Sequence, residues 1–275
     1  MESAQVQSLE VDVIDEKLVE NIRAHGIYTD SGEARDKVLE DIGFRSKEGA
    51  EYALILGCAQ PLATPHVLRA LKELLDRLQI DYTLLPMEYC CGWVPLGQPA
   101  VMARNDEDIA RAKELSREFV VANFRQAEAL GAKSIALFCA ACEPSYTNWA
   151  AATGLEVISY SELLERHFSG GRLDGEVDYY AGCYRFRRRI TSEPVGVEAA
   201  VRVLDRIEGL RVNHLDSTRC CYIPLHLEEL TGSLTTRTVV TICTGCYHSL
   251  RGKLQAAGDY QVRMLPEIVL DAVRR

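Results

Sequence analysis

Cysteine is the residue type whose spacing indicates chemistry in this chain. The 275 residues include ten cysteines, in two groups with the same order: a single cysteine, two adjacent cysteines and a Cys-x-x-Cys pair. The first group is Cys58, Cys90, Cys91, Cys139 and Cys142, and the second is Cys183, Cys220, Cys221, Cys243 and Cys246. Adjacent cysteines are poor disulfide partners, because the bond closes a strained ring. Metal binding or redox chemistry is therefore the usual explanation for such a pattern.

The residues around the cysteines repeat as well. LGC at Cys58 matches AGC at Cys183, CCGWVPL matches CCYIPL, and FCAAC matches ICTGC. The two copies lie roughly 105 to 130 residues apart. A repeat of this length indicates two copies of one structural unit.

The number of thiols in each copy limits what each could bind. Structural zinc takes four ligands in a closed tetrahedron, so one cysteine of each group would stay unused. A thioredoxin-like site needs one Cys-x-x-Cys and a resolving thiol, which leaves the other cysteines unexplained. A cubane iron–sulfur cluster takes four thiolates, usually from clustered spacings that neither copy has. Adjacent cysteines more easily reach two parts of an opened cluster, but the residues alone leave the alternatives open.

The elements that must position these cysteines follow from the apolar pattern. Apolar runs predict strands at 51–58, 81–86, 133–139, 177–183, 210–215 and 238–243. Helical spacing predicts helices at 64–79, 106–131, 142–154 and 193–209, and another from 247 onward. Thr64 and Pro65 favour a helix start, Gly131 favours a helix end, and Pro194 falls in a first turn.

Alternating strands and helices imply parallel sheets with right-handed crossovers. The predicted fold class is α/β, with two pseudo-symmetric Rossmann-like parallel-sheet halves and a helical N-terminal extension. The expected domains are the extension at 1–50, a first half at 51–170 and a second half at 171–275. Ligands of such sheets bind at the carboxyl ends of the strands. The five thiols of each group can therefore meet despite their large sequence gaps.

The first 50 residues contain no cysteine. Two short helices are expected at 15–26 and 30–43, the second opened by Asp30 with Glu33 at the spacing of a capping box. We expect this extension to pack on the core or to dock a partner.

Composition and charge argue against several other classes of protein. A chain with 47% hydrophobic and 26% charged residues is typical of globular proteins. The net charge of −9, without a basic face, argues against a nucleic-acid partner. No apolar run reaches the roughly 18 residues of a membrane span, and the N-terminus lacks the pattern of a signal peptide. The expected location is the cytoplasm, where free thiols persist.

The complete pattern, with Gly92 after the first adjacent pair, resembles the CCG domain found in the disulfide-cleaving subunit of heterodisulfide reductase and in related iron–sulfur oxidoreductases. The resemblance covers about residues 50–275 and uses every cysteine. It implies a duplicated CCG domain in which each group of five cysteines holds one non-cubane [4Fe-4S] cluster, two clusters in all. In that family the paired clusters cleave a disulfide between them, and each delivers one electron to one sulfur.

The same resemblance implies an activity and partners. The chain would be the catalytic member of a multi-subunit thiol–disulfide oxidoreductase that reduces or forms a disulfide, or acts on a sulfur carrier. Residues 17–50 resemble the linker that follows a ferredoxin-like domain in longer family members. The expected partners are therefore a ferredoxin-like iron–sulfur subunit, similar to the one in heterodisulfide reductase, and a flavin-containing subunit.

The second copy departs from the family pattern in two ways. The gap between the adjacent pair and the Cys-x-x-Cys has 47 residues in the first copy but 21 in the second, too few for an equivalent of the helix at 106–131. Tyr222 also stands where the first copy has Gly92. These departures favour one alternative, a cluster in the first half only, in an electron-transfer subunit. A separate alternative, from another class of protein, is a zinc-stabilised interaction module.

Several other side chains near the cysteines are candidates for function. His226 and His248 flank the second group and are candidate proton donors, with a structural role as the alternative. Trp93 and Trp149 are expected to shield a cluster from water. The cations after Cys183 are candidates for binding an anionic substrate or an acidic partner, with a solvated face as the alternative. These cations are Arg185, Arg187, Arg188 and Arg189.

Overall fold

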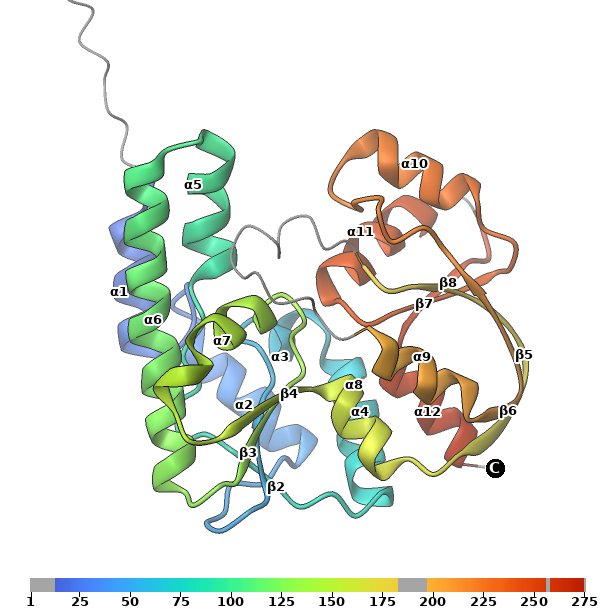
Figure 1. Cartoon of the computed structure of the whole chain (residues 1–275), viewed down its shortest axis with the longest axis horizontal. Coiled ribbons are helices and arrows are strands. Elements are labelled where there is room, and N and C mark those ends of the chain that lie inside the picture. The colour runs from blue at the N-terminus through green and yellow to red at the C-terminus, as the bar shows by residue number, and fades with distance from the viewer. Residues whose placement is uncertain (1–12, 183–196, 256–257, 275) are drawn as a thin grey trace, which may run out of the picture.

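The computed structural model describes residues 13–182, 197–255 and 258–274. Figure 1 shows two α/β halves side by side, the first coloured blue to yellow and the second yellow to red. Each half is built on a sheet of four parallel strands. Cys183, Pro194 and the four arginines that follow Cys183 lie outside the described residues.

The sheet of the first half has the strand order β2-β1-β3-β4. Its strands are β1 (Tyr52–Ile55), β2 (Tyr82–Leu84), β3 (Ser134–Leu137) and β4 (Glu156–Ser159). Every residue of β1 and β3 is buried, because these are the central strands and helices cover both faces. The predicted strands at 51–58, 81–86 and 133–139 are therefore confirmed.

The sheet of the second half repeats this arrangement with the order β6-β5-β7-β8. Its strands are β5 (Gly171–Tyr180), β6 (Ile207–His214), β7 (Thr238–Thr241) and β8 (Gln261–Met264). In both halves the second strand pairs with the first, the first with the third, and the third with the fourth. The identical topology confirms the predicted α/β fold of two Rossmann-like halves.

The longest helix of the described chain belongs to the first half. The helices of this half are α3 (Gln60–Ala63), α4 (Pro65–Arg77), α5 (Gln98–Ala103), α6 (Asp106–Ala129), α7 (Glu143–Trp149) and α8 (Tyr160–His167). The Asn105 side chain accepts the N–H groups of Glu107 and Asp108 and so caps α6. Gly131, at φ +74°, follows its end as predicted. Thr64 makes no side-chain cap, because its hydroxyl bonds back to Gln60.

The helices of the second half are shorter. In the described part of this half they are α9 (Glu198–Asp205), α10 (Pro224–Gly232), α11 (Thr244–Leu254) and α12 (Leu265–Val273). The helix predicted at 193–209 ends at Asp205, because Ile207 and Glu208 already pair with β5 as part of β6. The 21-residue gap holds the nine-residue α10, where the first half has the 24-residue α6.

Two helices of the N-terminal extension pack on the first half, α1 (Glu16–His25) and α2 (Gly32–Ile42). Asp15 caps α1 by accepting the Lys17 N–H. The predicted capping box at Asp30 is wrong, because α2 begins after Ser31 and has no side-chain cap. Of the two expected uses of this extension, the structure shows packing on the core.

The two halves share one hydrophobic core. Helix α12 packs on α4 and helix α9 packs on α8, so that helices of both halves meet between the two sheets. Among the polar contacts that cross the same boundary, the Tyr160 hydroxyl donates to the Ile242 carbonyl at 3.1 Å, and the Tyr247 hydroxyl lies 2.9 Å from His66 Nε2. Both contacts flank the Cys243–Cys246 motif. In the described ranges, no helix is long and apolar enough to cross a membrane.

Candidate functional site

The cysteines gather at the carboxyl edge of each sheet. Cys58 follows β1, the Cys90–Cys91 pair follows β2, and Cys139 follows β3. In the second half, the Cys220–Cys221 pair follows β6 and Cys243 follows β7. Parallel strands bring their carboxyl ends to one edge. Thiols that lie far apart in the sequence therefore lie together in the structure.

The five cysteines of the first group are buried free thiols that neighbour one another. Cys90 interacts with Cys58 and Cys91, and Cys142 interacts with Cys91 and Cys139. Hydrogen bonds from Cys142 and Cys90 hold the pKa of the central Cys91 well below its usual value. The structure thus brings together all five predicted residues of the first site.

Two side chains of α6 hold the loop that carries the adjacent pair. Asn123 accepts the Tyr89 N–H at 2.8 Å and donates to the Tyr89 carbonyl at 2.7 Å. Gln126 pairs with the N–H and the carbonyl of Met87 in the same way. Asn123 also donates to the Tyr146 hydroxyl at 2.6 Å. The long helix in the first gap therefore anchors the backbone just before Cys90.

Glu88 links two cysteine loops. Its carboxylate accepts the N–H groups of Leu56 and Gly57 at 2.8 and 2.7 Å, directly before Cys58. Burial raises the pKa of Glu88 to about 7, although Arg35 and the two backbone donors oppose this shift. Glu88 lies two residues before Cys90, so this single carboxylate holds the first cysteine loop against the second.

The N-terminal extension forms one wall of the first site. The Cys90 N–H donates to the Gly26 carbonyl at 2.8 Å, and Arg35 Nη1 donates to the Glu88 carbonyl at 3.0 Å. Burial, and then the charges of Cys58 and Cys90, raise the pKa of Tyr28. Residues of this extension therefore contact the loop of the adjacent pair, which no pattern in the sequence indicates.

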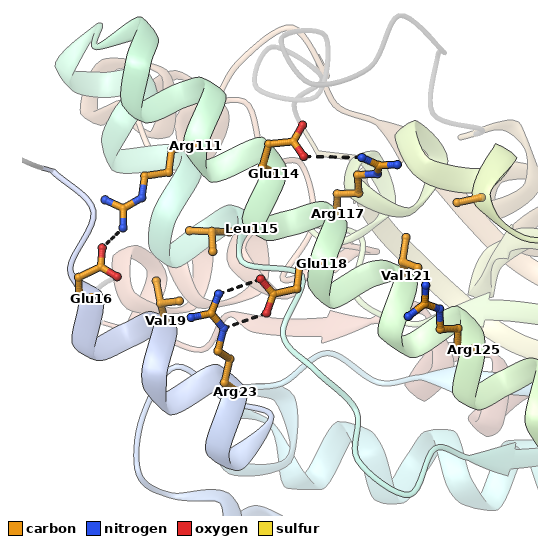
Figure 2. A pocket seen from close by; sticks show the side chains of 11 residues that line it. Glu16, Val19, Arg23, Arg111, Glu114, Leu115, Arg117, Glu118, Val121 and Arg125 are labelled. Atoms are coloured by element: carbon orange, nitrogen blue, oxygen red, sulfur yellow. Dashed lines mark hydrogen bonds and ion pairs between the residues drawn. The ribbon is translucent and has the colours of Figure 1, made fainter.

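Ion pairs tie α1 onto α6, as Figure 2 shows. Arg23 forms a bidentate salt bridge with Glu118, in which Nε and Nη2 each lie 2.8 Å from a carboxylate oxygen. Glu16 pairs with Arg111. A groove of about 820 Å³ runs along this face and is lined by arginines and glutamates. Because most of these charges already pair with each other, the contacts account for the docking of α1.

A glycine before the first cysteine of each group allows close approach to the Cys-x-x-Cys motif. Gly57 has φ +91°, and a Cβ there would come within 2.6 Å of the Cys139 Cβ. Gly182 has φ +95°, and its Cβ would come within 3.5 Å of the Cys246 Sγ. An L side chain is strained at these angles. The repeated LGC and AGC of the sequence therefore mark equivalent turns.

The second site contains the other four cysteines that the structure describes. Cys220, Cys221 and Cys246 are buried and Cys243 is partly exposed. The sulfurs of Cys221 and Cys246 lie 3.4 Å apart, and Cys243 also interacts with Cys246. The structure thus brings together these four residues of the predicted second set.

The two candidate histidines lie in different places. His226 Nδ1 accepts the Cys220 N–H at 3.1 Å, so its ring supports the adjacent pair. His248 lies two residues after Cys246 on α11, which places it on the opposite side of that helix. Burial, Arg251 and His66 lower the pKa of His248. Of these two histidines, His226 is therefore the one that contacts a cysteine residue.

Both tryptophans lie beside the first site. Trp93 is buried in the cluster that includes Cys91, Cys139 and Cys142, and Trp149 packs against the same cluster. The buried Ser145 hydroxyl has no nitrogen or oxygen partner among the described residues. It contributes instead to the lowered pKa of Cys91.

The donor set fits an iron–sulfur group better than a hard metal. The described cysteines are free and mostly buried, and thiolates are the ligands of such clusters. Within the described ranges, no three His, Cys, Asp or Glu side chains converge as ligands of a metal ion. In this conformation the thiols form chains of neighbours.

The fold and the sites define an α/β protein with a cysteine cluster in each of two similar halves. Residues 52–145 match the family model of the CCG cysteine-rich domain. All five cysteines of the first group lie within this range. The match confirms the predicted CCG resemblance and indicates an iron–sulfur or metal-binding role.

Other comparisons are distant. No curated protein matches the chain. An aspartate racemase homologue from Pyrococcus horikoshii OT3 is 12% identical over 81% of this chain and 96% of its own, with a TM-score of 0.37. A putative Asp/Glu racemase from Yersinia pestis is 13% identical over 82% of this chain and 100% of its own, also with a TM-score of 0.37. At these values the likeness bears on neither reaction nor substrate.

Proposed function

We propose that the chain is an iron–sulfur protein similar to the disulfide-cleaving subunit of heterodisulfide reductase, and that it reduces or forms a disulfide or a related sulfur substrate. The observation that carries this proposal is the gathering of the cysteines at the same edge of two sheets with one strand order. The CCG match over the first half supports it.

Two non-cubane [4Fe-4S] clusters are the proposed cofactors. Cys58, Cys90, Cys91, Cys139 and Cys142 would hold one, and Cys183, Cys220, Cys221, Cys243 and Cys246 the other. Such clusters supply electrons singly, and one disulfide takes up two electrons and two protons to give two thiols. Duplicated sites match this requirement, because each half can serve one sulfur.

The protein's own residues give the sites their shape. Glu88 and Asn123 fix the backbone around the first adjacent pair. In the second site, His226 accepts at Nδ1, so the neutral ring holds its proton on Nε2. The ring can donate a proton only after it takes up a second one at Nδ1, and that uptake breaks the bond to the Cys220 N–H. Because the described cysteines other than Cys243 are buried, little water reaches the thiols of either site.

The electrons come, in this proposal, from a ferredoxin-like iron–sulfur subunit, which a flavin-containing subunit supplies. The family resemblance supports these partners. If electrons passed in the opposite direction, from two thiols to the partner subunits, the reaction would form a disulfide. The direction of the reaction depends on the reduction potentials of the partners.

A disulfide-reduction assay tests the function. The protein, purified without oxygen, receives electrons from reduced methyl viologen and an aromatic disulfide that releases a coloured thiolate. We expect thiolate release well above the protein-free rate, and loss of this excess in Cys91→Ser and in Cys221→Ser. An equal rate in wild type and both variants would contradict the proposal.

A second candidate is an electron-transfer protein with a cluster in the first half only. The observation in its favour is the replacement of α6 by the short α10 in the second gap. It predicts that Cys221→Ser keeps all of the iron that the wild type holds.

A further inference from the structure

Tyr222, which directly follows the second adjacent pair, reaches across to the Cys-x-x-Cys motif. A Cβ on Gly245 would come within 2.7 Å of the Tyr222 hydroxyl oxygen and within 3.5 Å of its ring carbons Cε2 and Cζ. Gly245 lies between Cys243 and Cys246. The tyrosine therefore spans the distance between the two cysteine motifs of the second site, and its hydroxyl end lies on the backbone of one of them.

The side chain has one face on the site and one face in solvent. Partial burial raises the pKa of Tyr222, and the charges of Cys243, Cys221, Cys246 and Cys220 raise it further, so all four thiols lie near the phenol. The residue is nevertheless 57% exposed. This combination describes an outer wall of the site rather than a core residue.

The first site is closed in another way. Gly92 follows its adjacent pair, and a Cβ there would lie 3.4 Å from Phe119, a buried residue of α6. Its Cys-x-x-Cys has Ala141 where the second has Gly245. The second gap has no room for a helix of this length. The large and small residues are also exchanged between the two motifs: Tyr222 stands where the first half has Gly92, and Gly245 stands where it has Ala141. This exchange explains both substitutions at once.

We propose that Tyr222 is a substrate-contacting residue of the second site. Its ring covers the Cys243–Cys246 motif, and its hydroxyl donates a hydrogen bond to a sulfur of the disulfide or thiol that enters there. A phenol can donate to sulfur, and an aromatic ring makes favourable contacts with it. The contact with substrate rests on the proposed function, whereas the covering of the motif does not.

The covering is tested on cluster-free, reduced, folded protein. Iodoacetamide alkylation of Cys243 is followed by peptide mass spectrometry. We expect a rate increase of about threefold or more in Tyr222→Ala, and no increase in Tyr222→Phe, which keeps the ring. Leu225→Ala, which removes a side chain of the same half that is 63% exposed, is the control and should not change the rate. An unchanged rate in Tyr222→Ala would overturn the covering.

The hydroxyl contact is tested on the iron-loaded protein with the aromatic disulfide. Tyr222→Phe should lower kcat/KM about tenfold without changing the iron content. Gly245→Ala should have the same effect, because the added methyl displaces the hydroxyl, and the double variant should be no worse than either single one. Strictly multiplicative effects, or full activity of Tyr222→Phe, would refute the contact. Iron-free wild type would instead contradict the proposed function, and the alkylation result would still stand.

Discussion

The two halves hold the same order of cysteines with different supporting residues. In the first half, α6 and the N-terminal extension fix the adjacent pair through Asn123, Glu88 and Gly26. In the second half, His226 accepts the Cys220 N–H and Tyr222 covers the motif from outside. The strand order and the cysteine positions are thus repeated, but their surroundings are not. The comparison indicates that the same arrangement of strands and cysteines can be supported by different neighbouring residues.

The two halves also differ in how far solvent reaches their cysteines. Every cysteine of the first group is buried, whereas Cys243 of the second group is partly exposed. From the first half, Tyr160 bonds to the backbone carbonyl of Ile242, directly before Cys243, and His66 bonds to the side-chain hydroxyl of Tyr247, directly after Cys246. The second site therefore depends on the first half, but the first depends on its own long helix and the extension.

The largest effect is expected where the backbone approaches a cysteine most closely. Gly57→Ala adds strain at φ +91° and a clash with the Cys139 Cβ, so the free energy of unfolding should fall by about 3 kcal/mol. Gly182→Ala meets its nearest atom only at 3.5 Å and should cost about 1 kcal/mol less. Urea unfolding of the reduced protein measures both, with Gly154→Ala, which meets no neighbour, as the control. Equal costs at 57 and 182 would contradict the account.

A smaller loss of stability is expected when the Asn123 anchor of the first half is removed. Asn123→Ala leaves the part-buried Tyr89 backbone groups unpaired and should cost about 2 kcal/mol. It should also speed alkylation of Cys90 and Cys91 but not of Cys243. The control is Asn213→Ala, which removes an exposed bond to Thr235 and should cost about 0.5 kcal/mol or less. Faster alkylation of both halves would show that Asn123 is not specific to the first site.

The next largest effect on stability is expected at His226. His226→Ala removes the acceptor of the Cys220 N–H and should lower the free energy of unfolding by about 1 kcal/mol. His248→Ala, on the other side of α11, should not change the environment of Cys220. Backbone amide exchange at Cys220 compares the two variants. Faster exchange in His248→Ala than in His226→Ala would reverse the roles assigned here.

The smallest effect concerns the contact between the halves. Arg274 and Arg77 lower the pKa of Glu73 to about 2, although burial opposes this shift. Because the folded pKa lies below the ordinary 4.5, the stabilisation is present above pH 4.5 and is lost as the pH falls toward 2. Glu73→Gln should cost less than about 1 kcal/mol at neutral pH, since the pair is partly exposed. Urea unfolding at several pH values measures this cost, and a difference that grows on acidification would be inconsistent with this pair.

Much of the framework can be predicted from the sequence because its signals are local. Apolar strands that run into cysteines, Pro65 at a helix start and Gly131 after a helix end all act within a few residues. The elements β4 and α8, which contain no cysteines, are not among those predicted, although α8 carries a local signal in the capping box of Ser159 and Glu162.

The surroundings of the sites could not be predicted in the same way. Arg35 and Gly26 reach the first adjacent pair over more than fifty residues, and nothing in their local sequence indicates that contact. In the sequence, Tyr222 is only a departure from the family pattern. In the structure, it packs on Gly245, which leaves room for its side chain. Such contacts depend on tertiary packing, which local spacing does not encode. Cys183 and its arginines lie outside the described residues, so their roles remain predictions.

The most direct test counts iron and acid-labile sulfide per chain in protein prepared without oxygen. With a four-iron cluster in each half, the wild type should hold about eight irons and about eight sulfides. Cys91→Ser and Cys221→Ser should each hold about four. Zinc in place of iron, or a wild type with about four irons that Cys221→Ser leaves unchanged, would contradict the claim that both halves carry a cluster.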